Sequence, residues 1–198
     1  MRILVTGFTP FGRGRTNPSE WIARRLEVPG VVLVRGVLPT TYRGSEKALL
    51  RLLRRHRPDA VLSLGLSSSS SRLRLEMVAL NVDHAEVPDN SGERRERRKI
   101  RSHGTWVRES RLPIEEILDA WKRARVPGAV SYHAGTYVCN HLFYCLLGAT
   151  EVPAGFVHVP SFRKMKSAKI LEGIRAAIIA IARGRTRRPR ARWRSHPA

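Results

Sequence analysis

Glutamine is absent from this chain of 198 residues, and asparagine is scarce, occurring only as Asn17, Asn81, Asn90 and Asn140. Both amides are thermolabile, and their depletion is typical of proteins from thermophilic organisms. A genome rich in GC would also enrich arginine codons, so composition leaves both explanations open. The absence of glutamine therefore predicts a thermophilic host without excluding a compositional bias of the genome.

Long apolar runs and paired cysteines are also lacking. No apolar run reaches the roughly 20 residues that a transmembrane helix requires, and the N-terminal MRILVTGF is too short for a signal peptide. The two cysteines, Cys139 and Cys145, lie six positions apart in one predicted helix, where they face different sides and cannot form a disulfide. We therefore expect a cytoplasmic protein with reduced thiols and no membrane contact.

Acidic residues are few, with 16 Asp and Glu against 37 Lys and Arg, which gives a formal net charge of +21 and a pI of about 11.6. Such a surface attracts polyanions through counterion release. Seven arginines from Arg183 to Arg194 stand without apolar periodicity. We therefore predict a single α/β domain over residues 1–182, a basic disordered tail over residues 183–198, and weak polyanion binding through the basic surface and tail.

Strand and helix patterns alternate along the chain. Short β-branched runs predict buried strands at 2–8, 31–38, 60–66, 129–133 and 155–159, and 3.6-residue periodicity predicts helices at 19–26, 44–56, 113–125, about 139–147 and 168–182. Segment 72–82 alternates as a half-buried hairpin or edge strand, and segment 88–112 is charged enough to be an exposed excursion. Alternating units of this kind predict a three-layer αβα architecture with a mostly parallel, twisted central sheet.

The stretch AGTYVCNHLFY places Cys139 where a small-residue turn leads into a predicted helix. In parallel sheets, functional groups collect where strands end and helices begin. The first turn of a helix has free N–H groups and a dipole that favour a thiolate. Cys139 is therefore a candidate nucleophile, although a buried core thiol is the commoner role of a free cysteine.

A nucleophilic cysteine also needs a base and a group that orients the base. His158 lies at the end of the predicted strand GFVHVP, and Glu76 is flanked by apolar residues in RLEMVALN, where a buried carboxylate needs a partner. A core histidine and an exposed edge glutamate are the plain structural interpretations. Both residues nevertheless occupy places where a base and its partner could stand.

The motifs resemble, in their order and spacing, the pyroglutamyl peptidase I family, also called pyrrolidone-carboxylate peptidase, from Met1 to about Pro160. They are MRILVTGFTPFG followed by NPSE, LNVD with PDNSG, HAGTYVCN and GFVHVP. The resemblance implies a phosphorylase/hydrolase-like αβα fold and a cysteine peptidase that removes N-terminal pyroglutamate from blocked peptides.

Site roles follow from the same resemblance. It implies a triad in which Cys139 attacks the carbonyl, His158 acts as general acid and base, and Glu76 orients the imidazole. Phe8 and Phe11 would pack on the pyrrolidone ring. The family uses no metal or other cofactor, and its members are commonly tetramers, so homo-oligomers are expected.

The chain departs from the family pattern at three places. The five serines from Ser67 to Ser71 cover the place of a glycine-arginine pair, and Met77 and Glu86 stand where the family has arginines. A carboxylate at Glu86 would oppose the negative charge that develops on an attacked carbonyl. We therefore expect a divergent member whose substrate carries pyroglutamate or a related acyl group.

Two other interpretations use different residues. An inactive relative could bind nucleic acid through the basic runs 94–101 and 183–194, with Trp193 stacking on a base, although no helix-turn-helix, zinc-finger or RNA-recognition motif occurs. His141 and Cys145 have the i, i+4 spacing that brings two metal ligands to one helix face. Two ligands make a weak site, so we expect no metal there.

Overall fold

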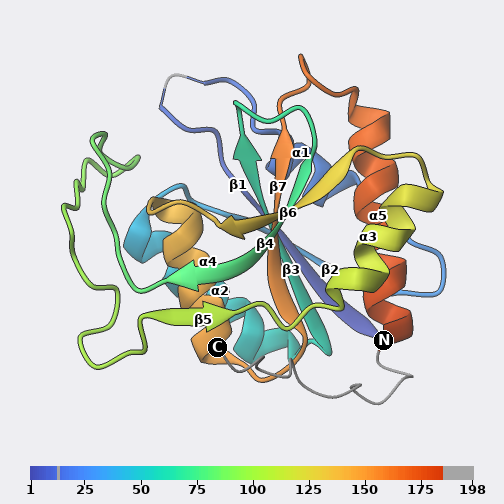
Figure 1. Cartoon of the computed structure of the whole chain (residues 1–198). Coiled ribbons are helices and arrows are strands. Elements are labelled where there is room, and N and C mark those ends of the chain that lie inside the picture. Colours follow the sequence, from blue (N-terminus) through green and yellow to red (C-terminus); the bar gives the residue numbers. More distant parts are fainter. Residues whose placement is uncertain (13, 185–198) are drawn as a thin grey trace, which may run out of the picture.

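The computed structural model describes residues 1–12 and 14–184, in which helices and strands alternate as predicted (Figure 1). The elements are β1 (Arg2–Phe8), α1 (Pro18–Arg25), β2 (Val32–Leu38), α2 (Tyr42–His56), β3 (Ala60–Ser67), β4 (Leu73–Leu80), β5 (Val107–Glu109), α3 (Ile114–Arg123), β6 (Gly128–His133), α4 (Val138–Ala149), β7 (Ala154–Pro160) and α5 (Ser167–Gly184). Helix α5 extends two residues past the predicted domain end at 182. Most of the predicted tail, including Trp193, lies outside the described residues.

The central sheet is mostly parallel, as predicted. Strands β2, β1, β3 and β7 are neighbours in that order and pair in parallel. Strand β4 is antiparallel to β7 on one side and parallel to β6 on the other. The prediction that residues 72–82 form a hairpin or edge strand is therefore wrong. Its partners come from distant segments of the chain, so the local alternation could show only that the strand is half-buried.

Two hydrophobic cores lie on the two faces of this sheet, which gives the three layers of the predicted architecture. Helices α1, α3 and α5 supply Ile22, Trp121 and Ile174 to one core. Helices α2 and α4 supply residues such as Leu49 and Phe143 to the other. Figure 1 shows α3 and α5 side by side on one flank and α2 and α4 on the other. The second core is the one that underlies the candidate site.

The first helix begins at Pro18, one residue before the start predicted from the sequence. Asn17 is the N-cap and accepts a hydrogen bond from the Ser19 backbone N–H, while Pro18 occupies the first helical position. A Cβ on Gly7 would lie 2.2 Å from the Ser19 carbonyl oxygen, so glycine is what lets α1 approach β1 this closely. This contact fixes the loop that follows β1 and carries Phe11.

The segment expected to be an exposed excursion, 88–112, is partly anchored in the body of the protein. Asp89, Arg95, Ile100 and Leu112 are buried, and β5 pairs with β4. Arg95 donates to Asp83 at 2.7 Å, so this buried guanidinium has a charged partner. The dense charge of the segment did not predict these buried residues, because their burial depends on partners from other parts of the fold.

Among the described residues, no helix combines the length and apolar character needed to cross a lipid bilayer.

Candidate active site

Glu76, Cys139 and His158 come together at the junction of β4, β7 and α4. In the antiparallel register of β4 and β7, Arg74 faces His158 and Glu76 faces Phe156. Oε1 of Glu76 lies 2.8 Å from Nδ1 of His158, and both residues are buried. Cys139, the second residue of α4, is half-buried and lies close enough to His158 to raise the pKa of the imidazole. The structure thus places Cys139 beside the hydrogen-bonded pair of Glu76 and His158.

The environment of His158 favours its charged form. Burial by itself lowers the pKa of His158, but hydrogen bonds to Cys139 and Glu76, together with the charges of these two groups, outweigh burial and raise the pKa to about 9. Oε1 of Glu76 binds the imidazole, while its buried Oε2 has no hydrogen-bond partner among the residues that the structure describes. A histidine held in this way can accept a proton from a thiol and keep it until a leaving group needs it.

The start of α4 is fixed to the sheet by Asn140, which follows the cysteine. Its Oδ1 accepts from the Leu80 N–H at 2.8 Å, and its Nδ2 donates to the carbonyls of Leu80 and Val82 at 2.9 and 3.0 Å. The N-cap of this helix, Tyr137, makes no side-chain capping hydrogen bond. The first backbone N–H groups of α4 are therefore available to stabilise negative charge beside Cys139.

Gly65 makes room for the thiol. It pairs with His158 across β3 and β7, and a Cβ at this position would lie 2.9 Å from Sγ of Cys139 and 2.7 Å from the Phe156 ring. Any larger residue would push against the thiol or the ring. The small residue at the end of β3 is therefore part of what positions Cys139.

Phe8 and Phe11, the two predicted ring-binding residues, occupy different environments. Phe8 is buried, and its ring centroid lies 6.5 Å from that of Phe156, whose ring in turn lies 4.9 Å from that of His158. Phe11 is 43% exposed, and its ring contacts Tyr137 edge-on at 5.5 Å. Only Phe11 thus presents a ring to solvent, next to the N-cap of α4.

Hydrogen bonds tie the loops around α4 to one another. Asn90 accepts from the Gly12 N–H at 3.0 Å and donates to the Pro10 carbonyl at 2.8 Å. Thr136 donates from its hydroxyl to the His84 carbonyl at 2.7 Å, and Tyr137 donates to the Pro88 carbonyl at 2.9 Å. The PDN segment therefore holds both the loop of Phe11 and the turn that leads to Cys139.

The three departures from the family pattern have distinct positions. Ser67 ends β3, and the serines that follow form a turn in which Ser69 accepts a hydrogen bond from Lys164. Met77 follows Glu76 on a strand, so its side chain points to the opposite face. Glu86 is exposed in the loop whose neighbours His84 and Pro88 bind the turn before Cys139.

Arg74 is a site residue that the sequence reasoning missed. Its Nε lies 3.6 Å from Oε1 of Glu76, and it donates to the Ser131 hydroxyl. It also lines a pocket of about 540 Å³ together with Ser69, Ser70 and Ser71. Two positions separate Arg74 from Glu76 on one strand, so the alternation of the sequence already placed both on one face. That signal could have identified it.

Comparison with known proteins identifies the family. The sequence model of the family described as pyroglutamyl peptidase matches residues 1–183. The pyrrolidone-carboxylate peptidase of Thermococcus onnurineus is 40% identical over 167 residues, which are 81% of this chain and 84% of that protein.

Solved structures agree with this match. Pyroglutamyl peptidase I of Bacillus amyloliquefaciens is 32% identical, with a TM-score of 0.87 over 92% of this chain and 97% of its own. A variant of the pyrrolidone carboxyl peptidase of Pyrococcus furiosus, a hyperthermophile, is 29% identical, with a TM-score of 0.89 over 93% of this chain and 99% of its own. These matches favour a peptidase over a nucleic-acid-binding protein, and the chain belongs to the pyroglutamyl peptidase family of cysteine peptidases.

Proposed function

We propose that this protein removes pyroglutamate from the N-terminus of blocked peptides, with Cys139 as the nucleophile, His158 as general acid and base, and Glu76 as the group that orients His158. The observation that carries the proposal is the 2.8 Å hydrogen bond between the buried Glu76 carboxylate and His158, with Cys139 beside the imidazole. A nucleophile, a base and an orienting group within reach of one another are the elements that thiol catalysis needs.

The reaction proceeds in two steps. His158 takes the thiol proton, and the sulfur of Cys139 attacks the carbonyl carbon that joins pyroglutamate to the next residue. The first N–H groups of α4 stabilise the oxyanion. His158 then gives its proton to the leaving amine, the C–N bond breaks, and a thioester remains. Water, losing a proton to His158, hydrolyses the thioester and releases pyroglutamate, and the proton returns to the thiol.

The pyrrolidone ring would lie against Phe11 on the accessible side of the site. Phe11 is the exposed ring of the pair and packs against Tyr137, which directly precedes α4. Phe8 would support the site indirectly, because it contacts Phe156, whose ring packs against His158. In this arrangement Phe11 binds substrate directly, and Phe8 supports the floor of the site.

Specificity is expected to differ from that of relatives with arginines at the three altered places. Glu86 adds an exposed carboxylate near the turn before Cys139, which disfavours anionic groups there. Arg74 supplies a cation from another position, 3.6 Å from Glu76 and beside the serine-lined pocket. The acyl group accepted is therefore pyroglutamate or a close neutral analogue.

The deciding experiment measures fluorescence release from pyroglutamyl-aminomethylcoumarin, with iodoacetamide labelling of the same samples. Release that is lost in Cys139→Ala supports the proposal. Rapid alkylation of Cys139 without release would mean that the thiol serves another acyl group. Neither release nor rapid alkylation would overturn catalysis altogether. Cys145→Ala is the matched control, because Cys145 is a buried thiol on the same helix and should leave both measurements unchanged.

Three further properties are proposed on the sequence and on the state of the thiols. Both cysteines are free, which fits a reducing cytoplasm. The net charge of +21 supports weak polyanion binding that added salt should abolish. The family resemblance supports a homo-oligomer, and light scattering at low and high salt would measure its mass and detect repulsion between basic faces.

A further inference from the structure

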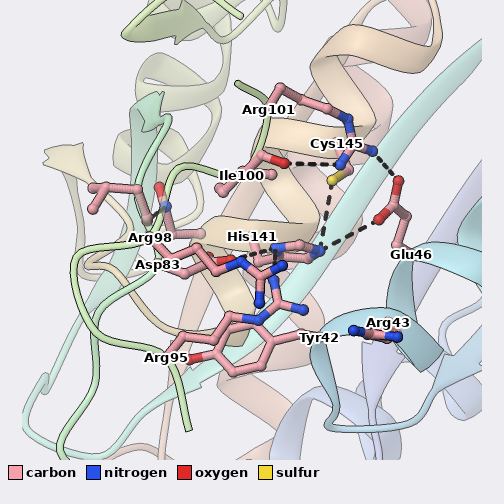
Figure 2. A network of polar contacts seen from close by, with 12 residues as sticks. Tyr42, Arg43, Glu46, Asp83, Arg95, Arg98, Ile100, Arg101, His141 and Cys145 are labelled. Atoms are coloured by element: carbon pink, nitrogen blue, oxygen red, sulfur yellow. Dashed lines mark hydrogen bonds and ion pairs between the residues drawn. The ribbon is translucent and has the colours of Figure 1, made fainter. Parts of the chain in front are cut away.

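A second cluster of ionisable groups, which does not include Glu76 or His158, lies between α2 and α4 (Figure 2). Glu46 comes from α2, and His141 and Cys145 lie one turn apart on α4. One ligand atom from each of the three lies within 4.8 Å of the other two. His141 and Cys145 are buried, and Glu46 is 21% exposed. None of these groups belongs to the peptidase mechanism.

Asp83 fixes the tautomer of His141. Its Oδ2 lies 2.9 Å from Nδ1 of His141 and also accepts from Arg95 at 2.7 Å. A carboxylate oxygen at this distance requires a proton on Nδ1, because two lone pairs would repel each other. The Nε2 lone pair of a neutral His141 therefore points toward Glu46 and Cys145. A carboxylate behind a histidine is the arrangement that orients histidine ligands of metals.

On the Nε2 side, His141 faces a carboxylate oxygen and a sulfur that is within hydrogen-bond distance. Nε2 lies 3.5 Å from Oε2 of Glu46 and 3.7 Å from Sγ of Cys145. With bonds of about 2.0 Å to nitrogen and oxygen and about 2.3 Å to sulfur, neighbouring ligand atoms of a tetrahedral zinc ion lie roughly 3.3 to 3.6 Å apart. The two separations from Nε2 are thus close to those around a tetrahedral cation, and the three ligand atoms lie within 4.8 Å of one another.

The cluster can be reached from outside. A pocket of about 540 Å³ is lined by Glu46, Arg101, Cys145 and Gly148. Arg101 binds the other oxygen of Glu46, Oε1, which leaves Oε2 facing His141 (Figure 2). The Arg101 side chain is 45% exposed, so it can move toward solvent when a metal ion binds Glu46. Access and a free fourth position for water are what distinguish an exchangeable site from a closed one.

We propose that Glu46, His141 and Cys145 bind a divalent zinc ion or another thiophilic metal of the same size. His141 contributes Nε2, Glu46 contributes Oε2, and the Cys145 thiol loses its proton to solvent as the metal–sulfur bond forms. Water occupies the fourth position. Sequence reasoning counted only the two ligands on α4, and the third comes from α2, 95 positions before His141. A bound ion would join the two helices that cover this face of the sheet.

Cobalt(II) is the probe, because a thiolate bound to it gives a charge-transfer absorption in the near ultraviolet. The full-length protein carries Cys139→Ala, so that Cys145 is its only thiol. One equivalent of cobalt should produce the absorption, and one equivalent of zinc should remove it. Adding Cys145→Ser should abolish it. No absorption in Cys139→Ala, or absorption that survives Cys145→Ser, would overturn the site.

A second measurement does not depend on the cysteine variant. Loss of a residue that only hydrogen-bonds a metal ligand costs about 10-fold to 100-fold in metal affinity. Glu46→Gln replaces a ligand itself, so it should weaken zinc binding by at least about tenfold, as measured by calorimetry. Zinc should also raise the Tm of Cys139→Ala. Glu20→Gln is the matched control, since Glu20 also pairs with an arginine but lies on α1. Equal zinc affinity in the two glutamate variants would contradict the proposal.

Discussion

His158 donates from Nδ1 to Oε1 of Glu76 at 2.8 Å, across the antiparallel contact of β7 with β4. Both residues lie on the face of the sheet that α4 covers, and the first turn of that helix places Cys139 beside them. The direction of β4 matters here, because it sets which of its residues stand opposite the end of β7.

Replacing the orienting carboxylate should remove most of the activity while preserving the shape of the site. Glu76→Gln keeps the volume of the side chain but removes the charge that supports a protonated His158. We expect kcat to fall by about 10² to 10⁴, the range of general acid–base catalysis. Release of aminomethylcoumarin measures the change. Glu109→Gln on β5, whose side chain is exposed, should keep full activity.

Activity should fall as pH rises through about 9. The pKa of His158 is raised to about 9 because hydrogen bonds and charges from Cys139 and Glu76 outweigh the effect of burial, so the imidazolium persists below that pH and is lost above it. The leaving amine needs the proton that His158 holds. The profile of kcat/KM should therefore have an alkaline limb near pH 9, and this limb should move to lower pH in Glu76→Gln. An alkaline limb at the same pH in Glu76→Gln would show that Glu76 does not raise the pKa of His158.

Adding one methyl group at Gly65 should disable the thiol. The new Cβ would lie 2.9 Å from Sγ of Cys139, and a displacement of about 1 Å in a reacting group costs roughly 10²-fold in rate. Gly155→Ala on β7 is the matched control, because its Cβ would press on Leu112 instead. Both variants should lose about 1 to 3 kcal/mol of unfolding free energy in urea, but only Gly65→Ala should lose kcat.

Alanine at the two phenylalanine positions should affect different properties, substrate binding for Phe11 and stability for Phe8. Phe11→Ala removes an exposed ring, so KM should rise several-fold while the Tm stays near that of the wild type. Phe8→Ala removes a buried ring of the core and should cost about 3 to 5 kcal/mol of stability. Thermal melts and steady-state kinetics on both variants measure the split. An unchanged KM in Phe11→Ala would remove Phe11 from substrate binding.

The sequence predicted what depends on neighbours along the chain. The buried strands and the helix that begins beside Cys139 follow from local spacing and apolar periodicity. Local patterns failed for β4, where the partners on both sides come from distant segments. They also missed Arg74, although its place two residues before Glu76 was available.

The four asparagines that the sequence keeps illustrate the same division. Composition alone indicates that amides are scarce, but the fold shows that each remaining side chain binds backbone groups of another segment or of a helix end. Asn140, for example, joins the turn of Cys139 to the end of β4. The few asparagines of this chain are thus placed where backbone groups need a hydrogen-bond partner.

The sequence by itself determined the order of elements, the family motifs and the identity of Glu76, Cys139 and His158 as residues of interest, because each is encoded in short stretches of the chain. Only the tertiary structure decided that Glu76 binds His158 beside Cys139, that Phe8 is buried while Phe11 is exposed, and that Glu46 joins His141 and Cys145. Such contacts join positions tens of residues apart. Their distances depend on how strands pair and helices pack, which no local pattern specifies.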